Sequence, residues 1–341
     1  MRPTIYDVAR AAGVGLATVD RVLNDRPGVR AATAERVKAA VDRLGFVRDA
    51  SAAALARKRV DTLAFLIPDG PSDFMHRLEA EAREAGRRLA GRRVNLDIRP
   101  VPPFDGDALA AALRALDLET VAGVALVATE GAAVKAELAR LGAAGIPVVT
   151  LVSDAPTYPR HRYVGIDNVA AGRTAGSLLG QFLGGKAGKI VVVAGSMLVR
   201  DHVERRMGFD QVILSQFPGL QASVTLEGRD EREATREALR ACLAREGDIV
   251  GLYNIGAGHE GIVDVLEALP AERRPVVVAH ELNDVTRAAL QGGLIHAVIN
   301  QDAGHEIRSA IRVLRSLIDG TPLSEGQETI RIEIYLRDNL P

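Results

Sequence analysis

The chain has 341 residues, of which 47% are hydrophobic, so it is long and apolar enough for at least two folded domains and is not a disordered chain. Its single cysteine, Cys242, excludes an internal disulfide and fits a reducing compartment. The net charge of −1 conceals an asymmetry, since the first 60 residues hold 12 basic and 6 acidic residues and the remainder holds 31 and 38. A basic first segment suggests a negatively charged partner, although a solvated, arginine-rich surface has the same composition.

The first residues, MRPTIYDVAR, are charged and polar, so we expect no secretory signal peptide. The sequence contains no run of about 18 uncharged apolar residues, so we expect no membrane span. Together these features predict a cytoplasmic protein without membrane contact.

Three short helices are predicted near the start, over about 5–12, 16–24 and 32–44. Thr4 can cap the first helix, and Gly13 can end it in a tight turn. Two helices joined in this way and closed by a third form a helix-turn-helix, and a structural helical hairpin is the alternative. The predicted core of this unit consists of Val8, Ala9, Val19, Val22, Leu23 and Val37. The second helix then presents Leu16, Ala17, Thr18, Asp20 and Arg21 on its outer face.

From Thr62 onwards, short apolar runs alternate with amphipathic segments, which predicts doubly wound parallel sheets. The predicted strands are TLAFLI, VNLDIRPV, GVALVA, PVVTLV, RYVGID, KIVVVAG, ASVTLE, IVGLYN, PVVVAH, IHAVIN and TIRIEIYL. The predicted helices lie near 73–90, 105–117, 131–143, 168–183, 201–216, 230–244, 259–268, 284–291 and 303–319. So many strands exceed one small sheet, so we divide them between two lobes.

The predicted fold class is therefore an all-α helix-turn-helix head followed by a two-lobed α/β body. The head covers 1–46, a hinge helix or linker covers 47–60, and the body covers 61–341. Within the body we expect lobe 1 at about 61–163 and 296–325, and lobe 2 at about 164–295 and 326–341.

Ligands of such sheets bind outside the carboxyl ends of the strands, so the residues after each strand are candidates for a binding site. In the first lobe these are Ser72, Asp73, Phe74, Thr129, Glu130, Ser153 and Asp154. In the second lobe they are Asp167, Asn168, the segment 196–202 with His202, then Arg205, Asn254, His280, Glu281 and Gln301. Carboxylates, amides and one arginine suit a polyhydroxylated ligand, which is bound through many directional hydrogen bonds.

Motifs of catalytic sites are incomplete in this sequence. GQFLGGKA has the spacing of a phosphate loop, but Ala187 stands where a magnesium-binding Ser or Thr belongs, and a predicted helix precedes the motif. Neither His259 nor His280 lies in an H-E-x-x-H zinc motif, and no G-x-S-x-G occurs. We therefore expect no enzyme, no cofactor and no metal.

The segment TIYDVARAAGVGLATVDRVLNDRPGVRAATAERVKAAVDRLGF resembles the DNA-binding head of the lactose-repressor (LacI) family. The resemblance implies that Leu16, Ala17 and Arg21 read bases, Arg21 through a bidentate contact to guanine. It also implies phosphate contacts from Thr4, Tyr6, Thr18, Asn24 and Thr33. Gly15 and Asp20 depart from the serines usual in the family, so the operator is not assumed to be the usual one. Asp20 would repel phosphates, orient Arg21 or accept from a cytosine amino group, and the sequence does not decide between these roles.

The segment RDASAAALARKR resembles the family's hinge helix, which inserts a leucine into the minor groove and pairs with its dimer mate. Leu55 occupies that position here. An ordinary polar-ended linker helix is the alternative.

The remainder of the chain resembles the family's effector domain, which is similar to periplasmic sugar-binding proteins of type I. Arg205, three residues before Gly208-Phe209, matches the sugar-binding arginine, and Glu281 stands where Asp is common. The predicted ligand-binding set is Asp73, Phe74, Asp154, Asp167, His202, Arg205, Asn254, Glu281 and Gln301. His280 is left open between a direct ligand contact and a supporting position behind the site.

The resulting hypothesis is a DNA-binding transcription regulator, acting as a repressor, whose operator affinity responds to a small sugar, polyol or sugar acid. The resemblance implies a homodimer on a near-palindromic, double-stranded operator. The alternative from another class is a solute-binding protein for a transporter. The sequence names neither the effector nor the operator, and it does not show whether the effector releases DNA or promotes binding.

Overall fold

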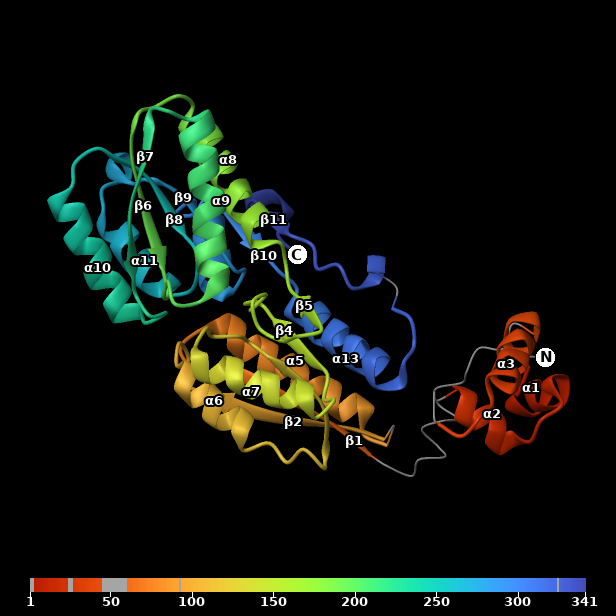
Figure 1. Cartoon of the computed structure of the whole chain (residues 1–341). Coiled ribbons are helices and arrows are strands. Elements are labelled where there is room, and N and C mark those ends of the chain that lie inside the picture. Colours follow the sequence, from red (N-terminus) through yellow and green to blue (C-terminus); the bar gives the residue numbers. More distant parts are fainter. Residues whose placement is uncertain (1–2, 24–26, 45–59, 92, 324) are drawn as a thin grey trace. The chain divides into compact units, whose positions relative to one another are not determined.

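The computed structural model describes residues 3–23, 27–44, 60–91, 93–323 and 325–341 (Figure 1). The chain divides into two compact units, 1–59 and 60–341, which we describe separately as the head and the body. Asn24, Leu55 and the predicted hinge helix lie outside the described residues.

The head contains three helices, as predicted: α1 (Ile5–Ala12), α2 (Leu16–Leu23) and α3 (Ala31–Leu44). The hydroxyl of Thr4 accepts the Asp7 N–H at 3.4 Å, and the Asp7 carboxylate accepts the Thr4 N–H at 2.9 Å, which closes a capping box. Gly13 ends α1 in the left-handed conformation at φ 63°, a backbone shape that glycine adopts without steric cost. These two local signals set the length of α1.

Apolar side chains at helical spacing form the core of the head. The fully packed members are Val8, Ala9, Ala12, Val19, Val22, Val37 and Ala40, with Leu23 partly buried beside them. Arg36 of α3 also donates to the carbonyl of Ala12 at 3.0 Å and so satisfies the exposed end of α1. The predicted core of the head is confirmed.

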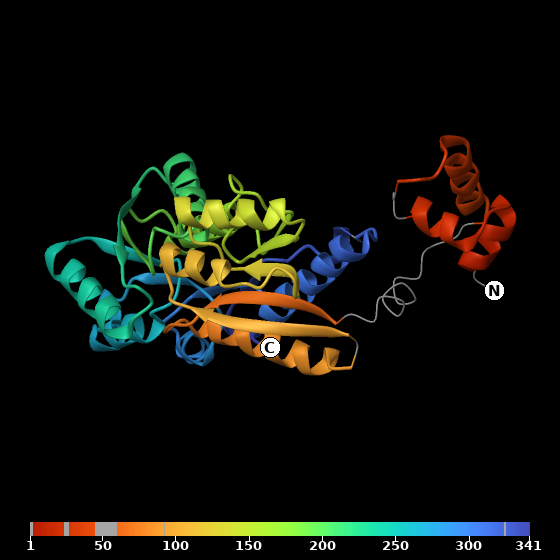
Figure 2. The ribbon, with the colours of Figure 1, turned by 60° about the horizontal axis from the view of Figure 1, so that its bottom comes forward.

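The first lobe of the body is a five-stranded parallel sheet covered on both faces. Its strands are β1 (Asp61–Pro68), β2 (Val94–Val101), β3 (Val121–Leu126), β4 (Val148–Leu151) and β5 (Arg162–Val164), in the order β2-β1-β3-β4-β5. Its helices are α5 (Asp73–Leu89), α13 (Ala303–Asp319), α6 (Gly106–Arg114) and α7 (Ala132–Ala143). In β1, Leu63 and Phe65 belong to the core under α5 and α13, and Leu66 belongs to the core under α6 and α7. Figure 2 shows β1 and β2 between these two helical layers.

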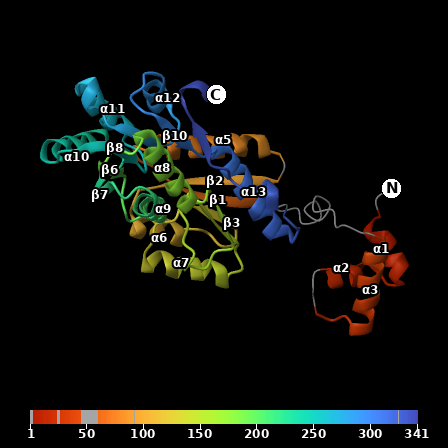
Figure 3. The same ribbon diagram turned by 90° about the horizontal axis from the view of Figure 1, so that it is seen from above.

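The second lobe is a six-stranded sheet, also covered on both faces (Figure 3). Its strands are β6 (Gly188–Ala194), β7 (Leu220–Glu227), β8 (Ile249–Asn254), β9 (Val276–His280), β10 (Ala297–Asn300) and β11 (Glu333–Tyr335), in the order β11-β10-β9-β8-β6-β7. One face carries α8 (Asn168–Leu183) and α9 (Arg200–Gln216), and the other carries α10 (Arg232–Arg245), α11 (His259–Ala268) and α12 (Asp284–Gln291). Single 3-10 turns lie at Ala271–Arg273, Glu325–Gln327 and Arg337–Asn339.

Two details of the lobes differ from the prediction. β10 pairs with β9 in the second sheet, so the chain returns to the first lobe after Asn300 and not near residue 296. Val298 and Ile299 are consistent with this placement, because both are buried and they belong to different cores, Val298 to the one under α10, α11 and α12 and Ile299 to the one that includes α8 and α9. β11 runs antiparallel to β10, because it is added to the sheet edge by a chain returning from α13.

Within the described residues, no helix combines the length and the apolar character that crossing a bilayer requires.

Candidate functional site

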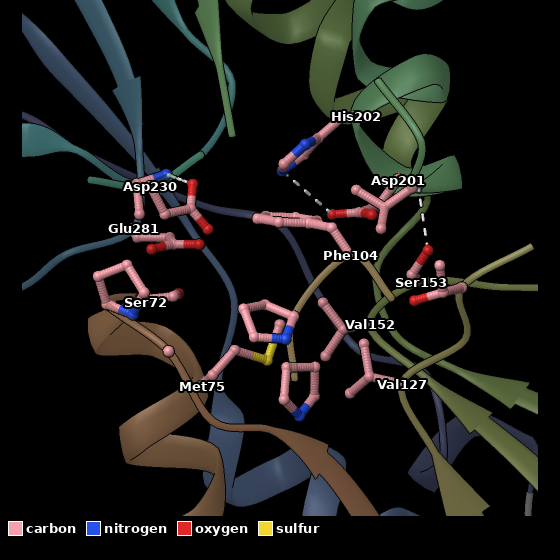
Figure 4. A pocket seen from close by; sticks show the side chains of 17 residues that line it. Ser72, Met75, Phe104, Val127, Val152, Ser153, Asp201, His202, Asp230 and Glu281 are labelled. Carbon is pink, nitrogen blue, oxygen red and sulfur yellow. Dashed lines mark hydrogen bonds and ion pairs between the residues drawn. The ribbon is translucent and has the colours of Figure 1, made fainter. Parts of the chain in front are cut away.

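A pocket lies between the two lobes, at the carboxyl ends of strands from both sheets (Figure 4). The space free for a ligand inside it is about 50 Å³, well below the roughly 300–1,000 Å³ of small-molecule sites, and the volume counted out to the open mouth is about 600 Å³. The first lobe contributes Pro68, Gly70, Pro71, Ser72, Met75, Pro103, Phe104, Val127, Thr129, Val152 and Ser153. The second lobe contributes Val199, Asp201, His202, Asp230, Ala257 and Glu281. The pocket therefore lies at the carboxyl ends of the strands, where the sequence predicted it.

Strained backbone marks the same pocket. Phe104, Val152, Asp230 and Glu281 all line it and hold positive φ angles of 59°, 59°, 62° and 68°. A non-glycine residue in this region costs about 1–3 kcal/mol, and such strain concentrates at functional sites. The fold therefore holds these four residues in costly conformations around one cavity.

The second lobe supplies the charged wall of the pocket. His202, from the first turns of α9, lies 2.7 Å from the Ser196 carbonyl oxygen through Nδ1, so this nitrogen carries the hydrogen. Its Nε2 lies 3.7 Å from the Asp201 carboxylate. The Asp230 carboxylate accepts the Ala257 N–H at 3.2 Å. Figure 4 shows Asp201, Asp230 and Glu281 directed into the pocket around the ring of Phe104.

Burial makes two of these carboxyls harder to ionise. Loss of water, together with the nearby charge of Asp230, raises the pKa of Glu281 from 4.5 to about 7. Burial also raises the pKa of Asp230, although His202 and the Ala257 N–H act in the opposite direction. Perturbed carboxyls in a cleft are typical of a ligand site.

Arg205 lies directly behind this wall and is only 1% exposed. Its Nε donates to Asn168 at 2.8 Å and its Nη1 donates to the Ile255 carbonyl at 2.9 Å. Its Nη2 has no hydrogen-bond partner and lies 3.9 Å from the Asp201 carboxylate. Arg205 is therefore next to the pocket and ties α9 to α8 and to the loop after β8, but it is not among the lining residues.

Glycines let α8 and α9 approach closely enough to place Arg205 there. A Cβ atom on Gly172 would lie 1.9 Å from the Arg205 carbonyl oxygen, and one on Gly208 would lie 2.1 Å from the Val169 carbonyl oxygen. Neither contact is possible for a real side chain, so both positions require glycine in this packing. Gly208 is the glycine of the Gly-Phe pair that follows Arg205 in the sequence.

The structure brings His202 and Glu281, of the nine predicted ligand residues, into the pocket lining. Ser72, Thr129 and Ser153, from the wider set of candidates after the strands, also line it.

Asp154, a predicted ligand residue, instead binds groups of its own loop. Arg160 holds its carboxylate through two hydrogen bonds of 2.8 and 2.7 Å, and Thr150 and the Ala155 N–H donate to it as well. Burial opposes ionisation, but these donors outweigh it and keep the pKa of Asp154 below its ordinary value. The predicted Asp167 is exposed and caps α8 through the Ala170 N–H at 2.9 Å.

Three more predicted residues are buried outside the lining. Phe74 is fully buried in the core under β1, which corrects its expected placement at a ligand. Asn254 donates to the carbonyls of Gly256 and Ala257 and shapes the loop after β8. Gln301 is 4% exposed, and its side-chain oxygen has no partner.

His280 also lies behind the pocket. Its Nε2 is 2.9 Å from the Tyr253 hydroxyl, and its ring is fully buried. It is not among the residues that line the pocket.

The remaining predicted residue, Asp73, joins the lobes. Its carboxylate accepts the Asn283 side-chain N–H at 2.6 Å, and Arg77 beside it donates to the Leu282 carbonyl at 2.5 Å. At another point of contact, Arg200 of the second lobe lies 3.5 Å from Glu130 of the first. Hydrogen bonds and an ion pair thus join the two lobes, and a change in the angle between the lobes would break them.

Sequence reasoning missed Phe104, Asp201 and Asp230 as individual site residues. Asp230 and Phe104 follow β7 and β2, two strands whose following residues were left out of the candidate ring. Applying the carboxyl-end argument to every strand would have found both. Asp201 lies next to His202 in the candidate segment, and only the three-dimensional structure shows that it faces the pocket.

In the head, the predicted face of α2 is accessible. Leu16 is 39% exposed, Ala17 and Arg21 are exposed, and Thr18 is half-buried. The ring of Tyr6 on α1 is 64% exposed. Thr4 is exposed but engaged in the cap of α1, and Thr33 is half-buried near the start of α3.

A helix-turn-helix head and a two-lobed α/β body with a pocket at its sheet edges define a class of ligand-responsive transcription regulators. Residues 4–49 match the family model described as bacterial regulatory proteins, lacI family, and residues 63–322 match the periplasmic binding protein domain. The HTH-type transcriptional regulator CelR of Thermobifida fusca is 30% identical over 262 residues, which are 74% of this chain and 73% of CelR. The chain belongs to the lacI family of bacterial regulatory proteins.

Other similarities cover one part of the chain. Catabolite control protein A of Priestia megaterium is 46% identical over 69 residues, but the match spans only 20% of this chain and 21% of that relative. GanP, a glucose-galactose binding protein from Geobacillus stearothermophilus, has a TM-score of 0.74 at 22% identity, covering 83% of this chain and 100% of GanP. The latter likeness confirms the expected type I periplasmic-binding-protein fold of the body.

Proposed function

We propose that the protein is a homodimeric repressor that binds a near-palindromic operator and responds to a small, carbohydrate-like effector held in the pocket between the lobes. The observation that carries this proposal is the pocket itself, because its wall combines residues from both lobes with strained, polar positions at the strand ends. A ligand there contacts both lobes at once, so its binding is coupled to their relative orientation. A regulator that acts on chromosomal DNA works in the cytoplasm.

The chemistry of the pocket supports a polyhydroxylated effector. Hydroxyls and carboxylates supply directional hydrogen bonds, and the apolar wall suits the C–H face of a small ring. Solved structures with the fold of the body are named for a glucose-galactose binding protein and for a solute-binding protein of Burkholderia graminis in complex with D-arabinose. The sequence-based candidates, a sugar, a polyol or a sugar acid, all belong to this class of ligand.

The exposed face of α2 supports base reading by Leu16, Ala17 and Arg21. Arg21 carries the fork of donors that matches guanine in the major groove. Phosphate contacts are assigned to Thr4, Tyr6, Thr18 and Thr33, and by sequence position also to Asn24. Leu55 is assigned to the minor groove on sequence alone.

The coupling between the two sites follows from hinge motion of the lobes. Effector binding changes the angle between them, and in the sequence the hinge segment, 47–60, directly precedes β1, the first strand of lobe 1. In a dimer this motion changes the distance between the two hinge segments and therefore their fit to DNA. Thermodynamic linkage requires operator DNA to change effector affinity by the same factor that the effector changes DNA affinity.

The test uses the full-length chain. Selection from random duplexes should yield a near-palindrome with half-sites about one helical turn apart, and binding to random DNA should weaken steeply with salt. A solute-binding protein would show neither behaviour.

A thermal-shift screen of sugars, polyols and sugar acids then identifies effectors, each of which should change operator affinity. Arg205→Ala should abolish the response and retain DNA binding, because the guanidinium supports the pocket wall and lies in the body. An Arg205→Ala protein that responds at the wild-type effector concentration would remove Arg205 from the site.

A further inference from the structure

The side chains that line the pocket are rich in hydrogen-bond acceptors and poor in donors. Asp201, Asp230 and Glu281 present carboxylate oxygens, and the hydroxyls of Ser72, Thr129 and Ser153 are the main source of hydrogens. The Nε2 of His202 is an acceptor in the neutral ring, and in the protonated ring it faces the Asp201 carboxylate. None of the described residues lining the pocket is a lysine or an arginine. A ligand that is rich in hydrogen-bond donors therefore complements this lining.

Glu281 is the lining carboxyl that most clearly lacks a hydrogen-bond donor from the chain. The residue is 7% exposed, and its Oε2 is buried without a hydrogen-bond partner. Its backbone is held at φ 68°, so the fold keeps this carboxyl at the pocket at a steric cost. A buried, unpaired polar atom is itself costly, which points to a partner that arrives from outside the chain.

Nearby cations offset the acidic wall only in part. Burial raises the pKa of both Asp230 and Glu281, whereas His202 lowers that of Asp230, and Arg205 and Arg77 lower that of Glu281. Arg205 directs Nε and Nη1 to Asn168 and Ile255, and its Nη2 faces Asp201 at 3.9 Å. Across the described part of the chain, no ion pair is formed by Asp230 or Glu281. The acids are also not arranged as a metal site, because no described group of three or more His, Cys, Asp or Glu side chains has the required geometry.

The opposite wall is apolar and comes from the first lobe. Phe104 and Met75 line it together with Pro68, Pro71, Pro103, Val127 and Val152. The ring of Phe104 lies between the Asp230–Glu281 pair and Asp201 in Figure 4. One side of the ligand therefore meets hydrocarbon, while its polar edge meets carboxylates.

We propose that the effector is an aminated sugar or aminated polyol whose protonated amine binds between Asp230 and Glu281, with its C–H face against Phe104. The inference rests on the proposed function and narrows its ligand class. An ammonium group offers three donors and no acceptor, which complements this wall. A sugar acid would add a carboxylate to a wall of three carboxyl groups, and like-charge repulsion disfavours it relative to the amine.

The first experiment compares matched probes by calorimetry on the full-length protein at pH 6 and pH 8. Each set contains an amine, its parent hydroxyl compound, its N-acetyl derivative and its acid. Glucosamine and galactosamine serve as amines, with glucose, galactose, the two N-acetylhexosamines and the corresponding aldonic acids. 2-Deoxystreptamine is added as an aminated polyol outside these sets. The amine of at least one set should bind about tenfold or more tighter than its hydroxyl and N-acetyl counterparts. The acids should bind more weakly than their amines.

Proton release gives a second readout. Asp230, Asp201, Arg205 and Arg77 all act on Glu281, and burial keeps much of this carboxyl protonated at pH 6. A bound ammonium requires the ionised form, so amine binding at pH 6 should release close to one proton, measured in buffers of different ionisation enthalpy. A neutral sugar that accepts a hydrogen bond from the protonated carboxyl releases none.

Substitutions of Glu281 and Asp230 test whether these two carboxyls bind the amine. Glu281→Gln and Asp230→Asn should each weaken amine binding about tenfold or more, a larger factor than for any hydroxyl counterpart that binds. Glu267→Gln is the matched control, because Glu267 is an exposed carboxylate of the same lobe outside the pocket. Folding of each variant is checked by its thermal transition.

The outcomes separate the two proposals. A neutral sugar or an acid that binds more tightly than its amine and shifts operator affinity overturns the amine inference and leaves the regulator in place. A panel in which no amine binds, or in which Mg²⁺ or Ca²⁺ alone occupies the site, also overturns the inference. An amine that binds at the wall but leaves DNA affinity unchanged supports the inference and counts against the proposed regulation.

Discussion

Replacing Glu281 by glutamine should change how the stability of the body depends on pH. In the folded protein the pKa of this carboxyl is raised from 4.5 to about 7, first by burial and then by the charge of Asp230. The folded state therefore holds the proton more tightly than the unfolded state does. Below about pH 4.5 Glu281 is protonated in both states, so its ionisation does not change the free energy of unfolding. As the pH rises towards 7 it ionises first in the unfolded state, so the free energy of unfolding falls.

The magnitude follows from the same shift. A rise from 4.5 to about 7 corresponds to about 3 kcal/mol of lost stability at pH 8 relative to pH 4. Glutamine has a similar shape and cannot ionise, so any fixed cost of the substitution is independent of pH. Relative to wild type, Glu281→Gln should thus gain about 3 kcal/mol between pH 4 and pH 8.

The required measurement is the difference in free energy of unfolding between the two proteins, because other titrating groups also change the pH dependence of each protein. Burial lowers the pKa of His259 to about 4, which makes the body more stable as the pH rises towards 6.5 and opposes the effect of Glu281. Urea unfolding of the ligand-free chain can be followed by tyrosine fluorescence, since every tyrosine except Tyr6 lies in the body. Glu267→Gln, at an exposed position, should track wild type. A wild-type-minus-Glu281→Gln difference that is flat across this pH range would refute the reasoning.

Three further predictions concern packing and the head. Gly172→Ala should destabilise the body by about 1–3 kcal/mol or more in the same urea assay, because its Cβ would lie 1.9 Å from a backbone oxygen. Gly142→Ala, on an open helix surface, is the control and should be neutral or stabilising by up to about 1 kcal/mol. Arg36→Ala should lower the stability of the head by about 1 kcal/mol through loss of its hydrogen bond to the Ala12 carbonyl, measured by helical circular dichroism; an unchanged transition would show that solvent replaces this bond. Arg21→Ala should cost about 1–3 kcal/mol on the selected operator and much less on random DNA, measured by fluorescence anisotropy, and equal losses on both would reassign Arg21 to phosphate contact.

The helices and strands and their order could be predicted from the sequence, because the signals for them are local. Gly13 ends α1 through its own backbone freedom, and Thr4 begins it through a hydrogen bond three residues away. The alternation of short apolar strands with amphipathic helices likewise predicted the layers of the body. Since the carboxyl ends of parallel strands share one edge, the sequence also located the pocket before its contacts were known.

Which carboxylates face the pocket could not be predicted from the sequence and depends on the folded chain. Asp154 and Asp230 both follow strands, but Asp154 is held by Arg160, while Asp230 stands in a strained loop with one backbone donor. The same holds for Phe74, whose position after β1 allows either a ligand contact or the core, and which packs into the core. Phe74 is decided by distant segments that pack around it, whereas Asp154 is decided by how its own loop folds, which brings Arg160 back onto its carboxylate. The spacing of residues along the chain specifies neither outcome.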